Sequence, residues 1–281
     1  MYKFILDDAW KSWAEYNLSK NASKKELFTI LLNHGYEFDV IKNLLEYQPT
    51  EDYLLERREV QGRMMAKEQT SVYAVPYKRL ADNPLAHRVD TSLADIYVVH
   101  DFLTKQECDG IINAMEANLK ASTVTDPNAD KSVRTSSTSH LDCKVPAVEV
   151  VERKIHDFIG ISLAHGEELQ GQRYLVGQEF KSHTDYFDGS ATYNLVHLDR
   201  GQRTWTFMVY LDDCEEGGHT RFTRLDYEVK PKMGKALIWN NQLPNGQGNH
   251  YTEHWGMPVT KGVKNVITKW MREKPAIRQI S

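Results

Sequence analysis

Gln172-Arg-Tyr-Leu-Val-Gly-Gln-Glu-Phe-Lys-Ser-His-Thr-Asp-Tyr-Phe187 is the stretch that decides the fold class of this chain. Its first part carries aromatic and β-branched side chains, which favour a strand, with Gly177 as a bulge. Side chains two positions apart on a strand point to the same face, so a strand here aims His183 and Asp185 into one cavity. An imidazole and a carboxylate are two of the three ligands that hold non-haem Fe(II) and leave other metal positions open.

The third ligand of such a site has to come from a distant strand. His254, in the stretch Glu-His-Trp-Gly-Met-Pro-Val at 253–259, is one candidate. His250 lies at a similar distance along the chain, and His219 competes on position alone. Spacing by itself does not choose among the three.

Lys264 is a second chemical signal, because it enters an apolar strand that runs to Trp270. A lysine in a buried strand is costly unless an anion meets it, whereas a solvated lysine at the strand edge needs no partner. An Fe(II) site beside a fixed cation suits a dicarboxylate that chelates the metal at one end and forms a salt bridge at the other. 2-Oxoglutarate is such a molecule.

The chain beyond Gly171 reads as a series of short strands separated by turn signals. Such spacing is typical of a β-sandwich or barrel, and helices that precede it are expected to pack on its outside. The predicted fold class is therefore α+β, with a β core and flanking helices. The predicted strands are 172–182, 203–211, 219–223, 226–230, 235–239 and 263–271.

The chain before Gly171 is mainly helical in pattern. Residues 1–70 are predicted to form a helical appendage of four helices, with a capping box at 23–26, an N-cap at Asp39 and a last helix over 51–69. Residues 71–94, with two prolines, are predicted to be a linker, and residues 95–281 the core domain. Within it we expect a strand at 96–99, a helix opened by a capping box at 104–107, an edge strand at 133–137 and a helix over 145–159 that ends at Gly160.

Composition excludes several classes of protein. The 281 residues have a formal net charge of −4 and no long basic run, which argues against nucleic acid and anionic membranes as partners. The N-terminal apolar run is too short for a signal peptide, and no run approaches the length of a membrane span. Three scattered cysteines suit free thiols in a reducing compartment, so the expected location is the cytoplasm.

The ordered motifs resemble the prolyl 4-hydroxylase family of Fe(II)- and 2-oxoglutarate-dependent dioxygenases, whose core is a double-stranded β-helix, or jelly roll. The resemblance covers about residues 95–273. It rests on Asp-Phe-Leu-Thr at 101–104, Arg-Thr-Ser-Ser at 134–137, Arg-Tyr-x-x-Gly-Gln at 173–178, His-x-Asp-Tyr-Phe at 183–187, Gly-Gln-Arg at 201–203, Glu-Glu-Gly-Gly-x-Thr-x-Phe at 215–222, Val-Lys-Pro-Lys-x-Gly-x-Ala-Leu at 229–237, and His-x-Gly-x-Pro-Val-x-x-Gly-x-Lys at 254–264 followed by Lys-Trp.

The resemblance implies a role for each matching residue. His183, Asp185 and His254 become the iron ligands, which would settle the choice among the three histidines. Lys264 becomes the cation for the distal carboxylate of 2-oxoglutarate, with Tyr174 and Thr220 hydrogen-bonding to it. The implied substrate-side residues are Arg203, Tyr186, Trp270, Arg134 and Ser136. The implied cofactors and cosubstrates are Fe(II), 2-oxoglutarate, O2 and ascorbate.

The implied reaction is hydroxylation of an unactivated C–H with release of succinate and CO2, on a prolyl residue of a peptide or protein. Hydroxylation of a free amino acid or other small molecule is the first alternative, and a non-catalytic β-helix that binds a partner is the second. The chain departs from the family pattern at Asn265, Met257, His219 and Arg221, and these departures are expected near the substrate side.

Overall fold

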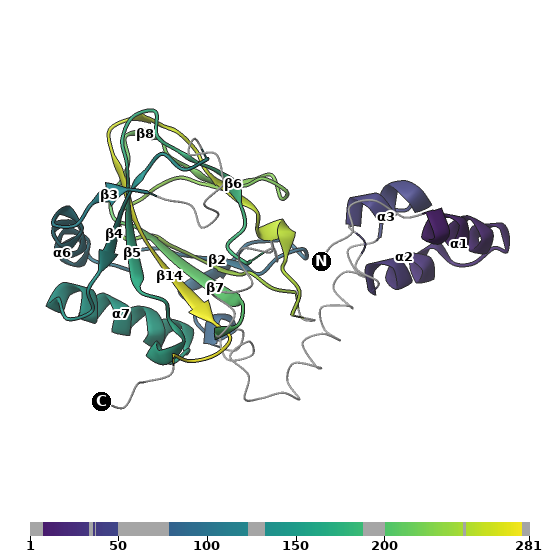
Figure 1. Cartoon of the computed structure of the whole chain (residues 1–281), viewed down its shortest axis with the longest axis horizontal. Coiled ribbons are helices and arrows are strands. Elements are labelled where there is room, and N and C mark those ends of the chain that lie inside the picture. Colours follow the sequence, from purple (N-terminus) through teal and green to yellow (C-terminus); the bar gives the residue numbers. More distant parts are fainter. Residues whose placement is uncertain are drawn as a thin grey trace. The chain divides into compact units, whose positions relative to one another are not determined.

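The computed structural model describes residues 8–33, 36, 38–49, 79–122, 133–187, 200–243 and 246–276. The chain divides into two compact units, Met1–Gln61 and Gly62–Ser281 (Figure 1). The larger unit contains every strand that the structure describes, and the smaller unit is helical.

The smaller unit contains α1 (Asp8–Ser19), α2 (Lys24–Asn33) and α3 (Phe38–Leu45). These helices confirm three of the four predicted in the appendage, and the fourth, at 51–69, lies outside the described residues. Asp39 is not an N-cap, because α3 already begins at Phe38. The unit has its own apolar core, formed by Ala14, Leu27, Phe28, Leu31, Tyr36, Ile41 and Leu45.

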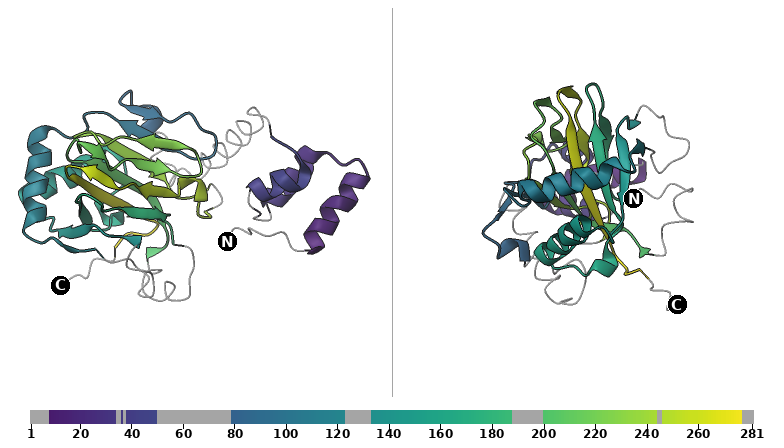
Figure 2. Two further views of the ribbon diagram at one scale, coloured as in Figure 1. Left: turned by 90° about the horizontal axis from the view of Figure 1, so that it is seen from above. Right: turned by 90° about the vertical axis from the view of Figure 1, so that its left-hand side faces the viewer.

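The larger unit is built on two facing antiparallel sheets, which confirms the predicted jelly roll (Figures 1 and 2). The major sheet has the order β1-β2-β11-β7-β14-β5-β4-β3. Its strands are β1 (Ala86–Arg88), β2 (Ile96–Val99), β3 (Lys120–Ala121), β4 (Ser137–Leu141), β5 (Leu169–Tyr174), β7 (Arg203–Tyr210), β11 (Ala236–Asn240) and β14 (Lys264–Arg272).

The minor sheet has the order β10-β9-β12-β6. Its strands are β6 (Phe180–His183), β9 (Thr220–Phe222), β10 (Tyr227–Val229) and β12 (His254–Gly256). A separate pair joins β8 (Glu216–Gly217) to β13 (Val259–Lys261), and two 3-10 turns lie at Leu163–His165 and His250–Thr252.

The major sheet separates two apolar layers, because alternate side chains of each strand point to opposite faces. On β7, Trp205, Phe207 and Val209 pack in the layer that two helices cover, while Met208 and Tyr210 pack in the layer between the sheets. The inner layer is where a strand can present a side chain to a cavity. The fold thus places the functional groups on the inner face.

Two helices cover the outer face of the major sheet (Figure 2). α6 (Lys105–Glu116) begins at the predicted capping box, in which Thr104 and Glu107 each accept a hydrogen bond from the other's backbone N–H. α7 (Pro146–Ile159) ends as predicted at Gly160, which has a left-handed φ of 78°. Within the described ranges, no helix combines the length and the apolar character that crossing a membrane requires.

The predicted linker at 71–94 is wrong for its described part, residues 79–94. β1 pairs with β2 and becomes the edge of the major sheet, and Leu80 is fully buried in the outer core. A short strand and one apolar residue among prolines carry too weak a periodic signal to be recognised without the sheet that they join.

Two strand predictions also differ from the structure. The single strand expected at 172–182 is two strands, β5 and β6, in different sheets, because the chain turns at Gly177 with a φ of 82°. The edge strand expected at 133–137 begins at its last residue, where β4 starts; Arg134 forms only an isolated bridge with Phe180.

Candidate active site

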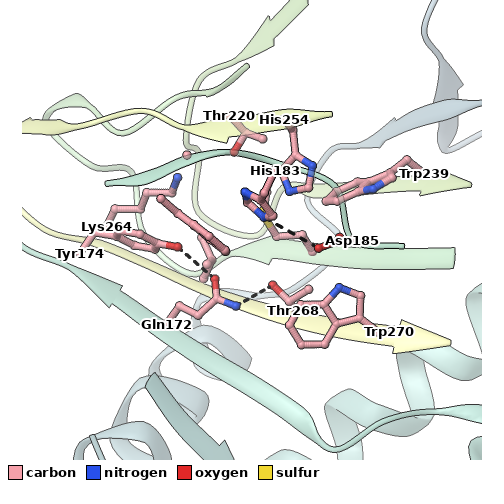
Figure 3. A pocket seen from close by; sticks show the side chains of 14 residues that line it. Gln172, Tyr174, His183, Asp185, Thr220, Trp239, His254, Lys264, Thr268 and Trp270 are labelled. Atoms are coloured by element: carbon pink, nitrogen blue, oxygen red, sulfur yellow. Dashed lines mark hydrogen bonds and ion pairs between the residues drawn. The ribbon is translucent and has the colours of Figure 1, made fainter. Parts of the chain in front are cut away.

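Three side chains from two neighbouring strands converge at the inner face of the minor sheet (Figure 3). His183 ends β6, Asp185 follows two residues later, and His254 begins β12 directly opposite His183 in the register. Their ligand atoms all lie within 4.8 Å of one another, and His183 Nε2 is 3.9 Å from Asp185 Oδ1. Across the part of the chain that the structure describes, no other group of His, Cys, Asp and Glu converges in this way.

The register between β6 and β12 explains why His254 joins the pair. His250 lies in the 3-10 turn before β12 and stacks on Tyr251, with a centroid distance of 4.8 Å. His219 lies beside Glu228, with Nδ1 3.2 Å from the carboxylate. The structure therefore brings together the three residues that the sequence motifs implied.

Both histidines are oriented to offer Nε2 to a metal. Nδ1 of His183 lies 2.8 Å from the carbonyl oxygen of Lys181, and Nδ1 of His254 lies 3.0 Å from that of Thr252. A carbonyl can only accept, so each Nδ1 carries a proton, and in the neutral form of each ring the lone pair lies on Nε2. Burial, together with the neighbouring His254, lowers the pKa of His183 to about 3, so this ring is neutral as metal binding requires.

Asp185 is held by a buried chain of hydrogen bonds. The Thr206 hydroxyl donates to Asp185 Oδ2 at 2.7 Å, and the Asn241 amide donates to the Thr206 oxygen at 2.8 Å. Burial alone would raise the pKa of Asp185, but the adjacent histidines, Arg203 and the Thr206 bond hold this pKa below its usual value. Asp185 is thus a carboxylate with one oxygen fixed by Thr206 and the other facing the histidines.

Replacing Thr206 with valine is expected to raise the Kd for Fe(II) about 10- to 100-fold, because an outer hydrogen-bonding partner orients the ligating carboxylate. Anaerobic metal titration measures this change. Thr204→Val is the matched control, since Thr204 is equally buried two residues away on β7 but bonds to the carbonyl of Met271. Equal metal affinities in the two variants would contradict the positioning role.

A pocket extends from the three converging residues along the inner faces of both sheets. β14 lines it with every second residue, namely Lys264, Val266, Thr268 and Trp270, as strand alternation requires. The other lining residues are Gln172, Tyr174, Phe180, His183, Asp185, Met208, Thr220, Trp239, His254 and Gly256.

Lys264 provides a buried cation at one end of this pocket. It is 2% exposed, and no hydrogen bond or ion pair of its ammonium occurs among the described residues. The ammonium lies over the rings of Tyr174 and Tyr210, at 5.1 and 5.7 Å from their centroids. The Thr220 hydroxyl lies 2.7 Å from the Tyr210 hydroxyl, which also lies 3.2 Å from the carbonyl oxygen of Val229. These donors fit a carboxylate.

The binding of a carboxylate here should depend on pH. Burial lowers the pKa of Lys264 to about 8, although Cys214 and Asp212 oppose the shift. The ammonium form alone binds the anion, so the Kd of 2-oxoglutarate should be nearly constant up to about pH 7 and then rise, about twofold by pH 8 and about tenfold by pH 9. Titration at constant metal saturation between pH 7 and 9 tests this expectation. A Kd that stays constant to pH 9 would contradict it.

Of the residues predicted on the substrate side, only Trp270 lines the pocket. Arg203 donates two hydrogen bonds to Glu167, at 2.8 and 2.7 Å, and its guanidinium lies 3.9 Å from the Trp270 ring centroid. Arg134 is buried, bonded to Ser136, and its guanidinium lies over the Phe180 ring. Tyr186 has its ring against Gly248, where an added Cβ would lie 2.4 Å from it.

Sequence reasoning missed several side chains of the site. Glu167 orients Arg203, and its pKa, which burial would raise, is lowered by Arg203 and Arg272. Gln172, Thr268, Met208 and Trp239 also line the pocket. Every second residue of a strand lies on the same face, so counting in twos from Lys264 and Tyr174 would have identified Thr268 and Gln172 as residues of the pocket face.

The expectation that the departures from the family pattern lie near the substrate side stays a prediction. His219, Arg221, Met257 and Asn265 are absent from the pocket lining. Arg221 pairs with Asp226 at 2.5 Å, and Asn265 bonds to Asp212 at 2.6 Å. Arg221 and Asn265 each adjoin a lining residue on a strand, and alternation turns their side chains to the opposite face.

Comparisons with known proteins agree with this geometry. The sequence profile of the 2OG-Fe(II) oxygenase superfamily matches residues 169–272. The probable prolyl 4-hydroxylase 10 of Arabidopsis thaliana is 37% identical over 199 residues, which cover 62% of this chain and 68% of the plant protein.

Two solved structures are also similar. The viral collagen prolyl hydroxylase of Paramecium Bursaria Chlorella virus-1, solved with 2-oxoglutarate, has a TM-score of 0.52 and 26% identity over 65% of this chain and 96% of the viral chain. A prolyl hydroxylase from Trichoplax adhaerens, solved with a peptide fragment of the hypoxia inducible factor, has a TM-score of 0.50 and 12% identity over 77% of this chain and 92% of its own, a likeness of fold alone.

Proposed function

Because the chain belongs to the prolyl 4-hydroxylase family of 2OG-Fe(II) oxygenases, we propose that it hydroxylates prolyl residues at C4 in a peptide or protein. The protein is an Fe(II)- and 2-oxoglutarate-dependent dioxygenase of the prolyl 4-hydroxylase type, for which ascorbate is a typical cofactor. Prolyl hydroxylases act on peptide substrates. Our proposal concerns the substrate, a prolyl residue of a peptide or protein.

We assign His183, Asp185 and His254 to the iron and Lys264, Thr220 and Tyr174 to the distal carboxylate of 2-oxoglutarate. The donor set fits both groups, since two imidazoles and one carboxylate suit Fe(II) and the buried ammonium requires an anion. When bound, Fe(II) with 2-oxoglutarate and O2 supplies an oxidant for an unactivated C–H, with succinate and CO2 as products. The surrounding side chains hold the reactants and exclude water.

One observation carries the proposal. A single pocket joins a candidate metal centre, a buried cation and the Trp270 ring, and the Arg203 guanidinium lies over that ring, 3.9 Å from its centroid. An aromatic face suits the ring of a prolyl residue, and a guanidinium suits the carbonyl oxygens of a peptide.

Mass spectrometry of proline-containing peptides incubated with Fe(II), 2-oxoglutarate, O2 and ascorbate tests the proposal. We expect a gain of one oxygen per modified proline, 4-hydroxyproline on amino-acid analysis, and succinate release that depends on the peptide. Release stimulated by a free amino acid instead would identify a small-molecule hydroxylase. An enzyme that binds 2-oxoglutarate but oxidises neither class of substrate would overturn the proposed substrate.

Replacing Arg203 with alanine is expected to raise the KM for a peptide substrate about 10- to 100-fold, because a hydrogen bond from a charged donor is lost. The Kd of 2-oxoglutarate should stay unchanged, which separates the two ends of the pocket. Arg173→Ala is the control, since Arg173 bonds to Asn265 and Glu116 outside the pocket. A similar rise in both Michaelis constants would contradict a substrate-side role for Arg203.

We also propose that the protein works in the cytoplasm or another reducing compartment. The proposal is supported by three free cysteines, of which Cys143 is exposed. Alkylation of freshly isolated protein should label Cys143 without prior reduction.

A further inference from the structure

Four polar side chains form a continuous hydrogen-bonded chain along the inner face of the major sheet. Arg134 Nη2 donates to Gln170 Oε1 at 2.9 Å, and Gln172 Nε2 lies 3.0 Å from the same oxygen. The Tyr174 hydroxyl lies 3.2 Å from Gln172 Oε1. Figure 3 shows the last of these bonds at the floor of the pocket.

The charged end fixes the direction of every bond in this chain. A guanidinium can only donate, so the atom of Gln170 that faces Arg134 has to be its oxygen. That oxygen can only accept, so Gln172 turns its Nε2 toward Gln170 and its Oε1 toward Tyr174. Flipping either amide would set donor against donor or acceptor against acceptor. Tyr174 is therefore the donor of the last bond.

The Tyr174 hydroxyl has one proton, which it donates in the hydrogen bond to Gln172 Oε1. Burial raises the pKa of Tyr174, so the hydroxyl stays protonated and cannot act as an anion. Arg134 and Ser136 also lie within hydrogen-bonding reach of this hydroxyl. Donors of Arg134 and Ser136 therefore face the oxygen of Tyr174, and its single proton is engaged by Gln172.

Tyr174 differs in this respect from the other two groups assigned to the distal carboxylate. Lys264 carries an ammonium with no acceptor among the described residues, and the hydrogen bond of Thr220 is to the hydroxyl of Tyr210, a group that can both donate and accept. Both can donate to an anion. Tyr174 can donate to an anion only after its hydroxyl proton turns away from Gln172 Oε1.

We propose that Gln172 is a positioning residue that competes with 2-oxoglutarate for the Tyr174 proton. This inference rests on the proposed placement of the distal carboxylate beside Lys264, Thr220 and Tyr174. A charged carboxylate is a stronger acceptor than a neutral amide, so the proton turns to the ligand when it binds. Gln172 Oε1 then loses its donor inside a buried site, and that loss opposes binding.

Replacing Gln172 with leucine removes the competing acceptor and should lower the Kd of 2-oxoglutarate about fivefold. Anaerobic titration of the Fe(II)-loaded protein, followed by the visible metal-to-ligand charge-transfer band, measures this Kd without turnover. Gln172→Met, which keeps the length of the side chain, replaces the leucine variant if that variant fails to fold.

Tyr174→Phe provides the control for the competition. This variant should bind 2-oxoglutarate more weakly than the wild type, and adding Gln172→Leu to it should leave the Kd unchanged, because there is no proton to release. Pyruvate has the same chelating end as 2-oxoglutarate but no distal carboxylate. Its Kd should be the same in the wild type and in Gln172→Leu.

The outcomes are distinguishable. A Gln172→Leu variant that binds 2-oxoglutarate as tightly as the wild type, or more weakly, overturns the competition, as does an equal gain in affinity for pyruvate. If wild-type protein with Fe(II) binds no 2-oxoglutarate, the proposed placement of this ligand falls and the role of Gln172 falls with it. If it binds and only the expected gain is missing, the proposed function stands without this inference.

Discussion

A Lys264→Met variant is expected to bind 2-oxoglutarate about 100- to 1,000-fold more weakly than the wild type. Removing one partner of a buried hydrogen-bonded charge pair typically costs about 2–5 kcal/mol, because the other charge is left without compensation. Lys264 is the only cation among the described residues that line the pocket, so no other lining side chain can take over. Methionine keeps the length of the side chain and its contact with the two tyrosine rings.

The Kd from anaerobic titration measures this effect, and the Kd for Fe(II) should change little in the same variant. Lys261→Met is the matched control, because Lys261 is exposed on the preceding strand and pairs with Glu215 at 2.8 Å. If Lys264→Met bound 2-oxoglutarate with near wild-type affinity, the distal carboxylate would have to lie elsewhere.

His254→Ala is expected to raise the Kd for Fe(II) by at least about 100-fold and to abolish succinate release. The loss of a ligand should exceed the 10- to 100-fold effect that is typical of losing an outer hydrogen-bonding partner. The two remaining residues, His183 and Asp185, are neighbours in sequence and leave the side of β12 without a donor. Equilibrium dialysis of the metal-free protein against Fe(II) under argon measures the change.

His219→Ala tests whether the effect belongs to this position. His219 competed with His254 as a third ligand on position alone, yet the structure places it beside Glu228 and outside the pocket. Its replacement should leave the Kd for Fe(II) within about twofold of the wild type, as expected for a surface change. A loss of metal in His219→Ala comparable to that in His254→Ala would show that the cluster has been assigned wrongly.

Features that depend on residues close together in the chain were predictable from the sequence. The His183–Asp185 spacing placed two side chains on one face, and the α6 capping box and the Gly160 terminus appear where the motifs put them. These signals are set by neighbouring residues through backbone geometry, so they can be read without knowing what the segment packs against.

Features that depend on long-range pairing were not predictable in this way. The choice of His254 over His250 needed either family motifs or the register of β12 against β6. Gly177 was expected as a bulge within one strand, but the chain turns there and enters a second sheet. A turn and a bulge both need a glycine, and only the partner strands distinguish them.

The sequence by itself determined the chemistry of the centre. Its motifs supply two histidines, an aspartate and a lysine in strands whose side chains alternate between two faces. Tertiary structure decided which side chains share the pocket with them. The side chains of Arg221 and Asn265 do not line the pocket, whereas Gln172 lies beside Tyr174 in it. β1 pairs with β2 and so belongs to the larger unit, together with Leu80. The physical reason is that identity and spacing fix what a side chain can do and which face it takes, whereas the assembly of the sheets fixes what lies opposite that face.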